Sequence, residues 1–349
     1  MSRLQTATMR PDFPRYELLR DPTLLQRLER TEAALQHRGL YIKRDDLMPI
    51  AMGGNKLRSL EYWLGAALRQ QADVLLVAGT PMSNLCRLTA AAASMAGLEC
   101  IVYHNAADEP AARSASFLNR IFGASVRFIG LIDEAQRTQA VEHAASELQR
   151  KGRRPYIVGN AALGALGYVR AAEELFAQAR RLDLGIRHVM LPGSMGTTEA
   201  GLIFGNALLG YPFDVHLVSV EYQEAELRAC VRRAYEAVAK LIGTGAPEFD
   251  DARIHYHMDY LGGGYACPTP QGEKAILTLA RTEGIVLEHV YTAKTFACFL
   301  DFAHRGVFPA AEPACVIHTG GVPALFSQFE LFRGVSFEPG GESTDAADK

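Results

Sequence analysis

Short apolar runs that end at a glycine and are followed by helix-forming stretches recur along this chain. The run Val74–Ala78 ends at Gly79, and the alanine-rich stretch Leu88–Ala96 that follows stops at Gly97, as helices commonly do. By the same patterns we expect further strands over Cys100–Tyr103, Val126–Ile129, His188–Leu191 and Val215–Val220, and helices over Asp133–Gln149, Val169–Leu182 and Gln271–Thr282. Alternation of strands with helices predicts an α/β fold with a largely parallel sheet, whose ligands bind beyond the carboxyl ends of its strands.

A length of 349 residues exceeds the usual size of one compact domain, so we expect two lobes with a cleft between them. The content of 48% hydrophobic and 21% charged residues is typical of a folded chain, with disorder expected only at the ends, as in the polar tail 340–349. The formal charge of −3 offers no basic surface for nucleic acid. No apolar run reaches the ~18 residues that span a bilayer, so we predict a soluble protein that binds neither nucleic acid nor membrane.

The six cysteines form no C-x-x-C pair and follow no secretory leader, which favours a reduced, cytoplasmic protein. We expect most of these thiols to be small core residues. A metal site is not expected, because His255 and His257 lack the H-E-x-x-H pattern and a nearby thiolate pair. A strand with two half-exposed histidines is the simpler interpretation.

The string Gly53-Gly-Asn-Lys56 places two glycines directly before a lysine. A chain that turns at these glycines and begins a helix at about Lys56 holds the amine at the helix N-terminus, where the helix dipole disfavours an ammonium. Partial desolvation there lowers the pKa of a lysine and supplies a free amine that can attack an aldehyde. A solvated lysine after an ordinary turn is the alternative that this string leaves open.

A second segment, Gly193-Ser-Met-Gly-Thr-Thr198, follows the apolar residues 189–191 and precedes an expected helix start near Ala200. Glycines allow backbone N–H groups to approach an anion, hydroxyls add donors, and a helix N-terminus favours negative charge. The segment therefore predicts a phosphate site or, equally, an ordinary strand-to-helix turn. The lysine of an NTP-binding loop is missing, which disfavours NTP hydrolysis.

A third segment, Thr80 to Arg87, carries Ser83 and Asn84 just after a strand. These small polar side chains are suited to bind a carboxylate or a phenolic oxygen. The alternative is that Ser83 caps the following helix. A lysine for an aldehyde, a cradle for a phosphate and polar groups for a carboxylate are together the parts that pyridoxal 5′-phosphate (PLP) chemistry needs.

These segments resemble the tryptophan-synthase-β-like PLP enzymes, and within them the branch of D-cysteine desulfhydrases and 1-aminocyclopropane-1-carboxylate deaminases. The resemblance runs through most of the chain and continues in 160–168, Gly264-Tyr265, 281–285, 290–294 and 318–321. It implies two open, twisted, mostly parallel sheets flanked by helices, with PLP in the cleft between a large domain (1–58 and 166–339) and a small one (59–165). It also implies a homodimer.

The resemblance implies a role for each matching residue. Lys56, Ser83, Tyr265 and Tyr291 would be catalytic, with Lys56 attaching PLP and Ser83 holding the substrate carboxylate or relaying a proton. Asn84 would bind the phenolic oxygen, and Thr292 or Thr319 would face the pyridine nitrogen. The remaining cofactor-binding residues would be Asn55, Ser194, Met195, Gly196, Thr197 and Thr198.

Two departures bear on the reaction. Where the family usually reads Gln-Ser-Asn-His, this chain has Met82 and Leu85 around the central pair, so we expect the substrate pocket to differ. After Tyr291 the cyclopropane deaminases carry a glutamate, whereas Thr292 stands here. We therefore predict α,β-elimination of a small amino acid, such as D-cysteine or another β-substituted alanine, to a 2-oxo acid and ammonia. β-Replacement, cyclopropane ring opening and non-catalytic PLP binding are the alternatives.

The acidic pair Asp45-Asp46 stands next to Arg44. Paired carboxylates can carry acid–base chemistry, but a neighbouring arginine favours a structural ion pair and a capping role. We expect no catalytic role for either aspartate.

Overall fold

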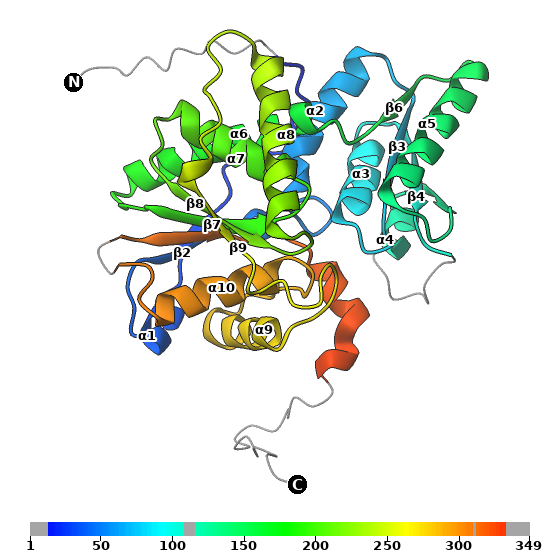
Figure 1. Cartoon of the computed structure of the whole chain (residues 1–349). Coiled ribbons are helices and arrows are strands. Elements are labelled where there is room, and N and C mark those ends of the chain that lie inside the picture. The colour runs from blue at the N-terminus through cyan, green and yellow to red at the C-terminus, as the bar shows by residue number, and fades with distance from the viewer. Residues whose placement is uncertain (1–12, 108–115, 310–311, 333–349) are drawn as a thin grey trace.

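The computed structural model describes residues 13–107, 116–309 and 312–332 of the chain. Two separate β-sheets, each flanked by helices, form two lobes that lie next to each other in Figure 1. The predicted α/β architecture with two mostly parallel sheets is therefore confirmed. The predicted disordered tail 340–349 lies outside the described residues.

The larger lobe contains a six-stranded sheet in the order β1-β2-β10-β7-β8-β9. All neighbouring strands run parallel except β1, which pairs with β2 in the antiparallel direction. The strands are β1 (Leu25–Arg27), β2 (Leu40–Lys43), β7 (His188–Gly193), β8 (Asp214–Ser219), β9 (Ile254–His257) and β10 (Ala314–Ile317). Because β7 and β8 are nearly continuous runs of buried residues, both faces of this sheet are covered, as expected for a parallel sheet.

The smaller lobe contains a four-stranded parallel sheet in the order β5-β4-β3-β6. Its strands are β3 (Val74–Gly79), β4 (Glu99–His104), β5 (Ser125–Phe128) and β6 (Pro155–Ile157). The central position of β3 explains its apolar sequence. All strands expected from the sequence are present, with bounds shifted by no more than two residues.

Ten α-helices and three short 3₁₀ helices are formed by the described residues. The α-helices are α1 (Glu29–Leu35), α2 (Lys56–Arg69), α3 (Asn84–Met95), α4 (Ser116–Ile121), α5 (Glu134–Arg150), α6 (Ala161–Arg181), α7 (Thr197–Leu208), α8 (Glu224–Ile242), α9 (Pro270–Glu283) and α10 (Thr292–His304). The 3₁₀ helices are η1 (Asp45–Leu47), η2 (Asp251–Arg253) and η3 (Val322–Phe332). None of the described helices is long and apolar enough to cross a membrane.

The six-stranded sheet lies between two helical layers (Figure 1). Helices α6, α7 and α8 pack with β7 and β8 in one apolar core, and α9 and α10 pack with β2 and β10 in another. The predicted domain boundaries, 58/59 and 165/166, fall inside α2 and α6, which pack against each other. We propose that these two helices connect the lobes.

Glycines allow α2, α6 and α7 to approach closely. A Cβ at Gly167 in α6 would lie 2.4 Å from the carbonyl group of Arg58 in α2. A Cβ at Gly201 in α7 would lie 2.2 Å from the carbonyl oxygen of Ala165. Side chains at these positions would force the helices apart, so the glycines fix α2, whose first residue is Lys56, against the large lobe.

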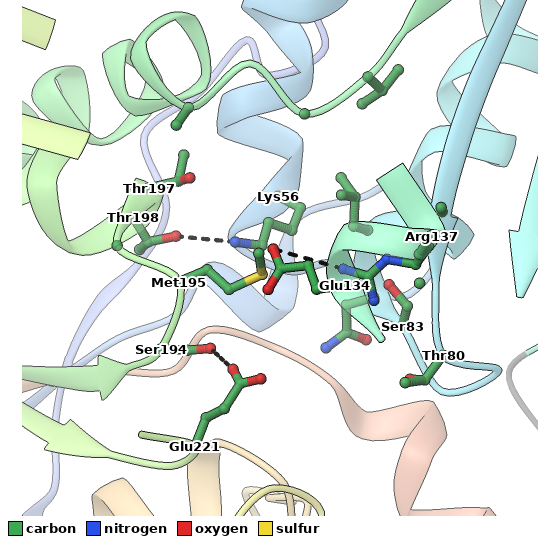
Figure 2. Close-up of a pocket in the computed structure, with 18 of the residues that line it drawn as sticks. Lys56, Thr80, Ser83, Glu134, Arg137, Ser194, Met195, Thr197, Thr198 and Glu221 are labelled. Atoms are coloured by element: carbon green, nitrogen blue, oxygen red, sulfur yellow. Dashed lines mark hydrogen bonds and ion pairs between the residues drawn. The ribbon is translucent and has the colours of Figure 1, made fainter. Parts of the chain in front are cut away.

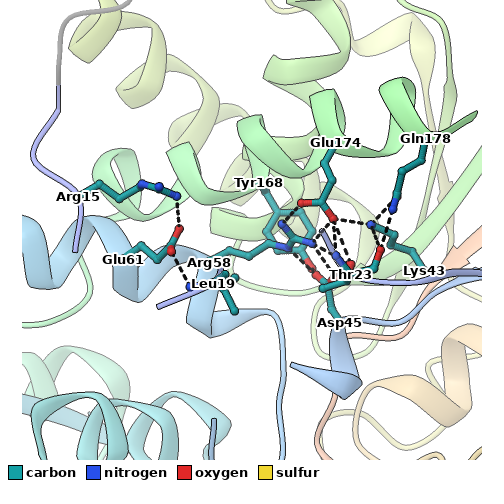
Figure 3. Close-up of polar contacts among 10 residues, drawn as sticks. All are labelled: Arg15, Leu19, Thr23, Lys43, Asp45, Arg58, Glu61, Tyr168, Glu174 and Gln178. Atoms are coloured by element: carbon teal, nitrogen blue, oxygen red, sulfur yellow. Dashed lines mark hydrogen bonds and ion pairs between the residues drawn. The ribbon is translucent and has the colours of Figure 1, made fainter. Parts of the chain in front are cut away.

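A buried network of charges fastens the same helix to the sheet (Figure 3). The carboxylate of Asp45 accepts hydrogen bonds from the Arg58 guanidinium at 2.8 and 2.9 Å and from the Tyr168 hydroxyl at 2.6 Å. Glu174 on α6 also accepts from Arg58, at 2.9 and 3.0 Å, and forms a short ion pair with Lys43. These contacts join β2, η1, α2 and α6.

Asp45 and Asp46 both form the ion pairs expected of a structural role. The expected partner, Arg44, is wrong for Asp45. Arg44 pairs with Asp46, at 2.8 and 2.9 Å, whereas Asp45 pairs with Arg58. The chain turns into η1 after Arg44, so Asp45 points into the lobe instead of back toward its neighbour. Sequence adjacency does not reveal this direction.

Candidate active site

A pocket of about 620 Å³ lies between the lobes. It is lined by residues from the start of α2, α3 and α7, where each helix follows a turn, and from the start of α5 in the small lobe. Figure 2 shows Lys56, Ser83, Ser194 and Thr198 around this pocket. The three segments that were predicted from the sequence to bind a cofactor or substrate therefore meet at one place. They are 53–58, 80–87 and 193–198.

Lys56 is the first residue of α2 and lines the pocket. The preceding turn has positive φ at Gly53 (+64°) and Gly54 (+128°), and a Cβ at Gly54 would lie 3.2 Å from the carbonyl oxygen of Thr319. Only glycine fits these requirements well. Desolvation by the surrounding protein lowers the pKa of the Lys56 amine, while the carboxylates of Glu199 and Glu221 oppose this shift. The site thus favours a neutral, nucleophilic amine.

Thr198 connects the lysine to the loop after β7. Its Oγ1 lies 3.0 Å from Nδ2 of Asn55 and 3.4 Å from Nζ of Lys56, and both groups donate to it. These bonds hold Asn55 and Lys56 next to Thr198, although 143 and 142 positions separate them from it in the sequence. Thr198 and Asn55 are both buried, so these contacts fix the direction in which the lysine amine points.

The loop after β7 presents an uncapped helix N-terminus to the pocket. Gly196 precedes α7 with a φ of +91° and no side-chain cap, and a Cβ there would lie 2.6 Å from the carbonyl oxygen of Cys230. The first N–H groups of a helix have no intrahelical acceptor. Together with the hydroxyls of Thr197 and Thr198, they form a site that fits a phosphate monoester.

Ser194 makes different contacts from those expected of a phosphate ligand. Its hydroxyl donates to the carboxylate of Glu221 in a short hydrogen bond, and its backbone N–H donates to Oε1 of Glu199 at 2.5 Å. Burial raises the pKa of Glu221, and the bond from Ser194 opposes this shift. Met195 lines the pocket with half of its surface exposed. Two carboxylates therefore flank the candidate phosphate site on one side.

Ser83 caps α3, as the structural alternative predicted, and also lines the pocket. Its Oγ accepts a hydrogen bond from the Cys86 N–H at 3.3 Å. Oδ1 of Asn84 accepts from Nη2 of Arg87 at 3.1 Å, and the same nitrogen donates to the carbonyl of Gly53 at 3.2 Å. Arg87 is fully buried, so it ties Asn84 to the turn that precedes the lysine.

Tyr265 and Tyr291 are brought together although 26 residues separate them. Their hydroxyls lie 2.7 Å apart, and both residues line the pocket. Burial raises the pKa of each tyrosine, that of Tyr291 well above its usual value. The pair therefore keeps its protons at neutral pH and can hold or donate one inside the pocket.

The two threonine candidates for the pyridine nitrogen have different positions. Thr319 lines the pocket, directly beneath the turn at Gly54. Thr292 is not among the pocket-lining residues described, and its Oγ1 bonds to the carbonyl and carboxylate of Glu288. The Glu288 carboxylate also accepts from the N–H groups of residues 290–292, which anchors the start of α10. The geometry favours Thr319.

Of the two substituted positions around Ser83 and Asn84, Leu85 contributes to the pocket wall. Met82 is half-buried and is not among the lining residues described. The apolar replacement that faces a ligand is therefore Leu85.

Several lining residues were not predicted from the sequence. The charged ones are the carboxylates of Asp133, Glu134, Glu142, Glu199 and Glu221 and the guanidinium of Arg137. Glu221 follows β8, so its place at the carboxyl end of a parallel strand was a usable signal. Glu134 and Arg137 stand in an ordinary amphipathic helix, and only the packing of the lobes turns them toward the pocket.

Comparison with known proteins matches this fold and site to one class. A family model described as "pyridoxal-phosphate dependent enzyme" matches residues 16–320. D-cysteine desulfhydrases of Salmonella paratyphi B and Salmonella typhi are each 37% identical over 324 residues, which cover 90% of this chain and 96% of theirs. A crystal structure of an ACC deaminase homologue superposes with a TM-score of 0.83 at 31% identity, covering 92% of this chain and 95% of that one.

A two-lobed α/β fold with a desolvated lysine facing an open helix N-terminus fits the class of PLP-dependent enzymes. The chain belongs to the pyridoxal-phosphate dependent enzyme family. A crystal structure of O-ureido-L-serine synthase, 15% identical with a TM-score of 0.66, shares the fold. The predicted cofactor is thus PLP, and the residues of the pocket fit it, since an amine, a phosphate site and a buried hydroxyl stand in one cavity.

Proposed function

We propose that this protein catalyses α,β-elimination from a small β-substituted amino acid, releasing a 2-oxo acid and ammonia. The observation that carries this proposal is the position of Lys56. Its desolvated amine lies against Thr198 at the mouth of the α7 N-terminus. When bound there, PLP supplies an electron sink for the electron pair left by the α-proton.

Each pocket residue has a proposed role in this reaction. The amine of Lys56 attaches the cofactor and then takes the α-proton, for which a lowered pKa is suitable. The backbone N–H groups of 196–198 and the Thr197 and Thr198 hydroxyls hold the phosphate. Asn84 binds the phenolic oxygen, and the neutral hydroxyl of Thr319 faces the pyridine nitrogen.

The remaining catalytic groups act on the substrate. The N-terminus of α3, where Ser83, Asn84 and Leu85 line the pocket, holds the α-carboxylate, because the first N–H groups of a helix have no intrahelical acceptor. The hydrogen-bonded hydroxyls of Tyr265 and Tyr291 hold a proton for the departing β-substituent.

D-cysteine or another β-substituted alanine is the substrate we propose. The support is the 37% identity to proteins named D-cysteine desulfhydrase over almost the whole chain. Ring-opening deamination of a cyclopropane amino acid is the second candidate, favoured by the similarity to an ACC deaminase homologue. Thr292 argues against it, since the cyclopropane deaminases carry a glutamate at the matching position, and β-replacement remains the third reaction this scaffold supports.

We also propose a cytoplasmic homodimer. Five of the six cysteines are buried free thiols, which suits a reducing compartment. The dimer follows from the family resemblance.

The test of the proposed function is product analysis with purified protein and added PLP. D-cysteine, β-chloro-D-alanine, their L-enantiomers and 1-aminocyclopropane-1-carboxylate are supplied, with and without an added thiol. We expect pyruvate and ammonia from the β-substituted alanines, unaffected by the thiol. A 2-oxo acid only from the cyclopropane, or a thioether product only with thiol, would identify an alternative. If no product forms and the PLP absorbance does not change, the protein binds PLP without catalysing a reaction of these compounds.

A further inference from the structure

The wall of the pocket that α5 and its cap form carries charged side chains that the proposed reaction does not use: Asp133, Glu134, Arg137 and Glu142. Glu134 and Arg137 lie in the first turns of α5, and both line the pocket. Among the residues described, Arg137 and Lys56 are the only lysine or arginine in that lining. Figure 2 shows Arg137 beside Ser83, on the side of the view away from Thr197 and Thr198.

These two charged groups are only loosely paired with each other. Nη2 of Arg137 lies 3.9 Å from Oε1 of Glu134, at the limit of an ion pair. The guanidinium has five N–H donors and the carboxylate accepts several hydrogen bonds, so both retain capacity for a ligand. The Arg137 side chain is 19% exposed and that of Glu134 is 55% exposed, so Arg137 is the more sheltered of the two and both are accessible to a ligand.

A capping box fixes the start of the helix that carries the pair. Asp133 caps α5, accepting from the Gln136 N–H at 2.8 Å, and the Gln136 side chain accepts from the Asp133 N–H at 3.2 Å. This capping box fixes the first turn of the helix. The positions of Glu134 and Arg137 relative to the pocket are therefore set by the fold and not by a mobile loop.

Both charges also act across the pocket. Burial raises the pKa of Glu221 on the opposite wall, and Glu134 adds to that shift whereas Arg137 opposes it. A ligand between the two walls therefore meets a negatively charged carboxylate and a positively charged guanidinium from α5 at the same time. A group with one charge only would satisfy one of them and repel the other.

We propose that Glu134 and Arg137 bind a second amino-acid head group, carried at the far end of the substrate's β-substituent. Arg137 receives the carboxylate and Glu134 the ammonium. The α-carboxylate is already assigned to the start of α3, so the second head group needs its own site. This inference rests on the proposed elimination and names its substrate class: a thioether that joins two amino acids.

The reaction of such a substrate balances without a further reagent except water. The C–S bond on the β-carbon breaks, and the sulfur leaves with a proton as the thiol of the second amino acid. The remaining three-carbon unit takes up one water and releases ammonium and pyruvate. Lys56 accepts the α-proton at the start, and no oxidant or reductant takes part.

Four thioethers of cysteine with the same three-carbon chain separate the two contacts. Cystathionine carries both far groups, S-(3-carboxypropyl)cysteine only the carboxylate, S-(3-aminopropyl)cysteine only the amine, and S-propylcysteine neither. Each is used with the cysteine unit in both configurations. We expect the wild-type protein to show kcat/KM for cystathionine at least about tenfold above that for S-propylcysteine, as for a charged hydrogen bond.

Two variants assign the contacts. R137Q is expected to lose about tenfold in kcat/KM with the two carboxylate-bearing thioethers and nothing with S-propylcysteine. E134Q is expected to lose activity with the two amine-bearing thioethers only. E147Q and R150Q are the matched controls, because that pair has the same spacing and the same 3.9 Å separation on the exposed far end of α5.

Equal activity of the wild-type protein on all four thioethers, or an equal loss on all four in R137Q, would overturn the proposal. Turnover of D-cysteine alone leaves the proposed elimination intact while this inference fails. If no compound yields a 2-oxo acid, the elimination fails. In that case each thioether is titrated into the protein and its dissociation constant is read from the absorbance of bound PLP. The inference then requires the same ranking in affinity, with cystathionine bound most tightly and S-propylcysteine least.

Discussion

The guanidinium of Arg58 donates to both carboxylate oxygens of Asp45, at 2.9 Å from Nε and 2.8 Å from Nη2. Arg58 stands two residues after Lys56 on α2, and Asp45 stands in η1. Both side chains are buried. The position of Lys56 therefore depends on an ion pair whose two residues are not among the described residues that line the pocket.

Replacing Arg58 by methionine is expected to destabilise the protein strongly. Asp45 and Glu174 would keep their negative charges in the protein interior without the guanidinium that both now bind. Breaking a buried pair in this way costs about 3–5 kcal/mol. The free energy of unfolding in urea measures the loss, and Arg69→Gln, at the exposed end of the same helix, is the control. A change of less than 1 kcal/mol, on the order of an exposed pair, would contradict this role.

Replacing Thr198 by valine is expected to weaken PLP binding. The change removes the oxygen that accepts from both Asn55 and Lys56 and one hydroxyl of the phosphate site. We expect the dissociation constant for PLP to rise about tenfold, the effect of one lost charge-assisted hydrogen bond. Thr198→Ser, which keeps the hydroxyl, should bind PLP nearly as the wild-type protein does. Equal weakening in both variants would contradict this role of the hydroxyl, because the serine variant retains it.

Tyr291→Phe and Tyr265→Phe are each expected to lower kcat more than they change KM. The two hydroxyls share one hydrogen bond of 2.7 Å inside the pocket, so removing either one disturbs the proton that the other holds. Loss of a general acid commonly lowers the rate about a hundredfold. Steady-state kinetics with D-cysteine measures both constants. A rise in KM with unchanged kcat would assign the tyrosines to substrate binding alone.

A row of imidazoles on the six-stranded sheet makes stability depend on pH. Nε2 of His216 lies 3.1 Å from Nδ1 of His188, and Nδ1 of His216 lies 3.0 Å from Nε2 of His257. His188 also bonds to Glu312, and Asp214 and His255 lie nearby. Burial lowers the pKa of His216 to about 2 and that of His257 to about 4.

These lowered values fix the sign of the dependence. Below pH 6.5 the unfolded chain binds protons at these histidines that the folded chain does not, so the free energy of unfolding falls as the pH falls. His216→Asn should reduce that slope by up to about 1.4 kcal/mol per pH unit between pH 6 and 4. His143→Asn, on an exposed side chain, should leave it unchanged. An unaltered slope in the His216 variant would refute the assignment.

The parts of the site that follow local rules could be predicted from the sequence. The glycines before Lys56 need positive φ, and the glycine before Thr197 lets the chain pass close to Cys230. Both requirements favour glycine, so the glycines in the sequence indicate them. The alternation of strands and helices likewise predicted the parallel sheets, because a strand covered on both faces must be apolar along its length.

The parts that depend on packing between distant segments could not be predicted. Nothing in the sequence around Arg137 distinguishes its helix from an exposed amphipathic one, and only the approach of the two lobes brings it to the pocket. Thr292 was a candidate because of its place after Tyr291. In the structure its hydroxyl bonds instead to Glu288, at the start of α10.

The most direct test of the account is the visible absorbance of the purified protein with PLP, compared between the wild type and Lys56→Ala. We expect the wild type to show the band of PLP bound covalently to a lysine, and borohydride reduction to attach the cofactor to the peptide that contains Lys56. The alanine variant should bind PLP without that band and form no 2-oxo acid from D-cysteine. An unchanged band in Lys56→Ala, or a label on another lysine, would contradict the central claim.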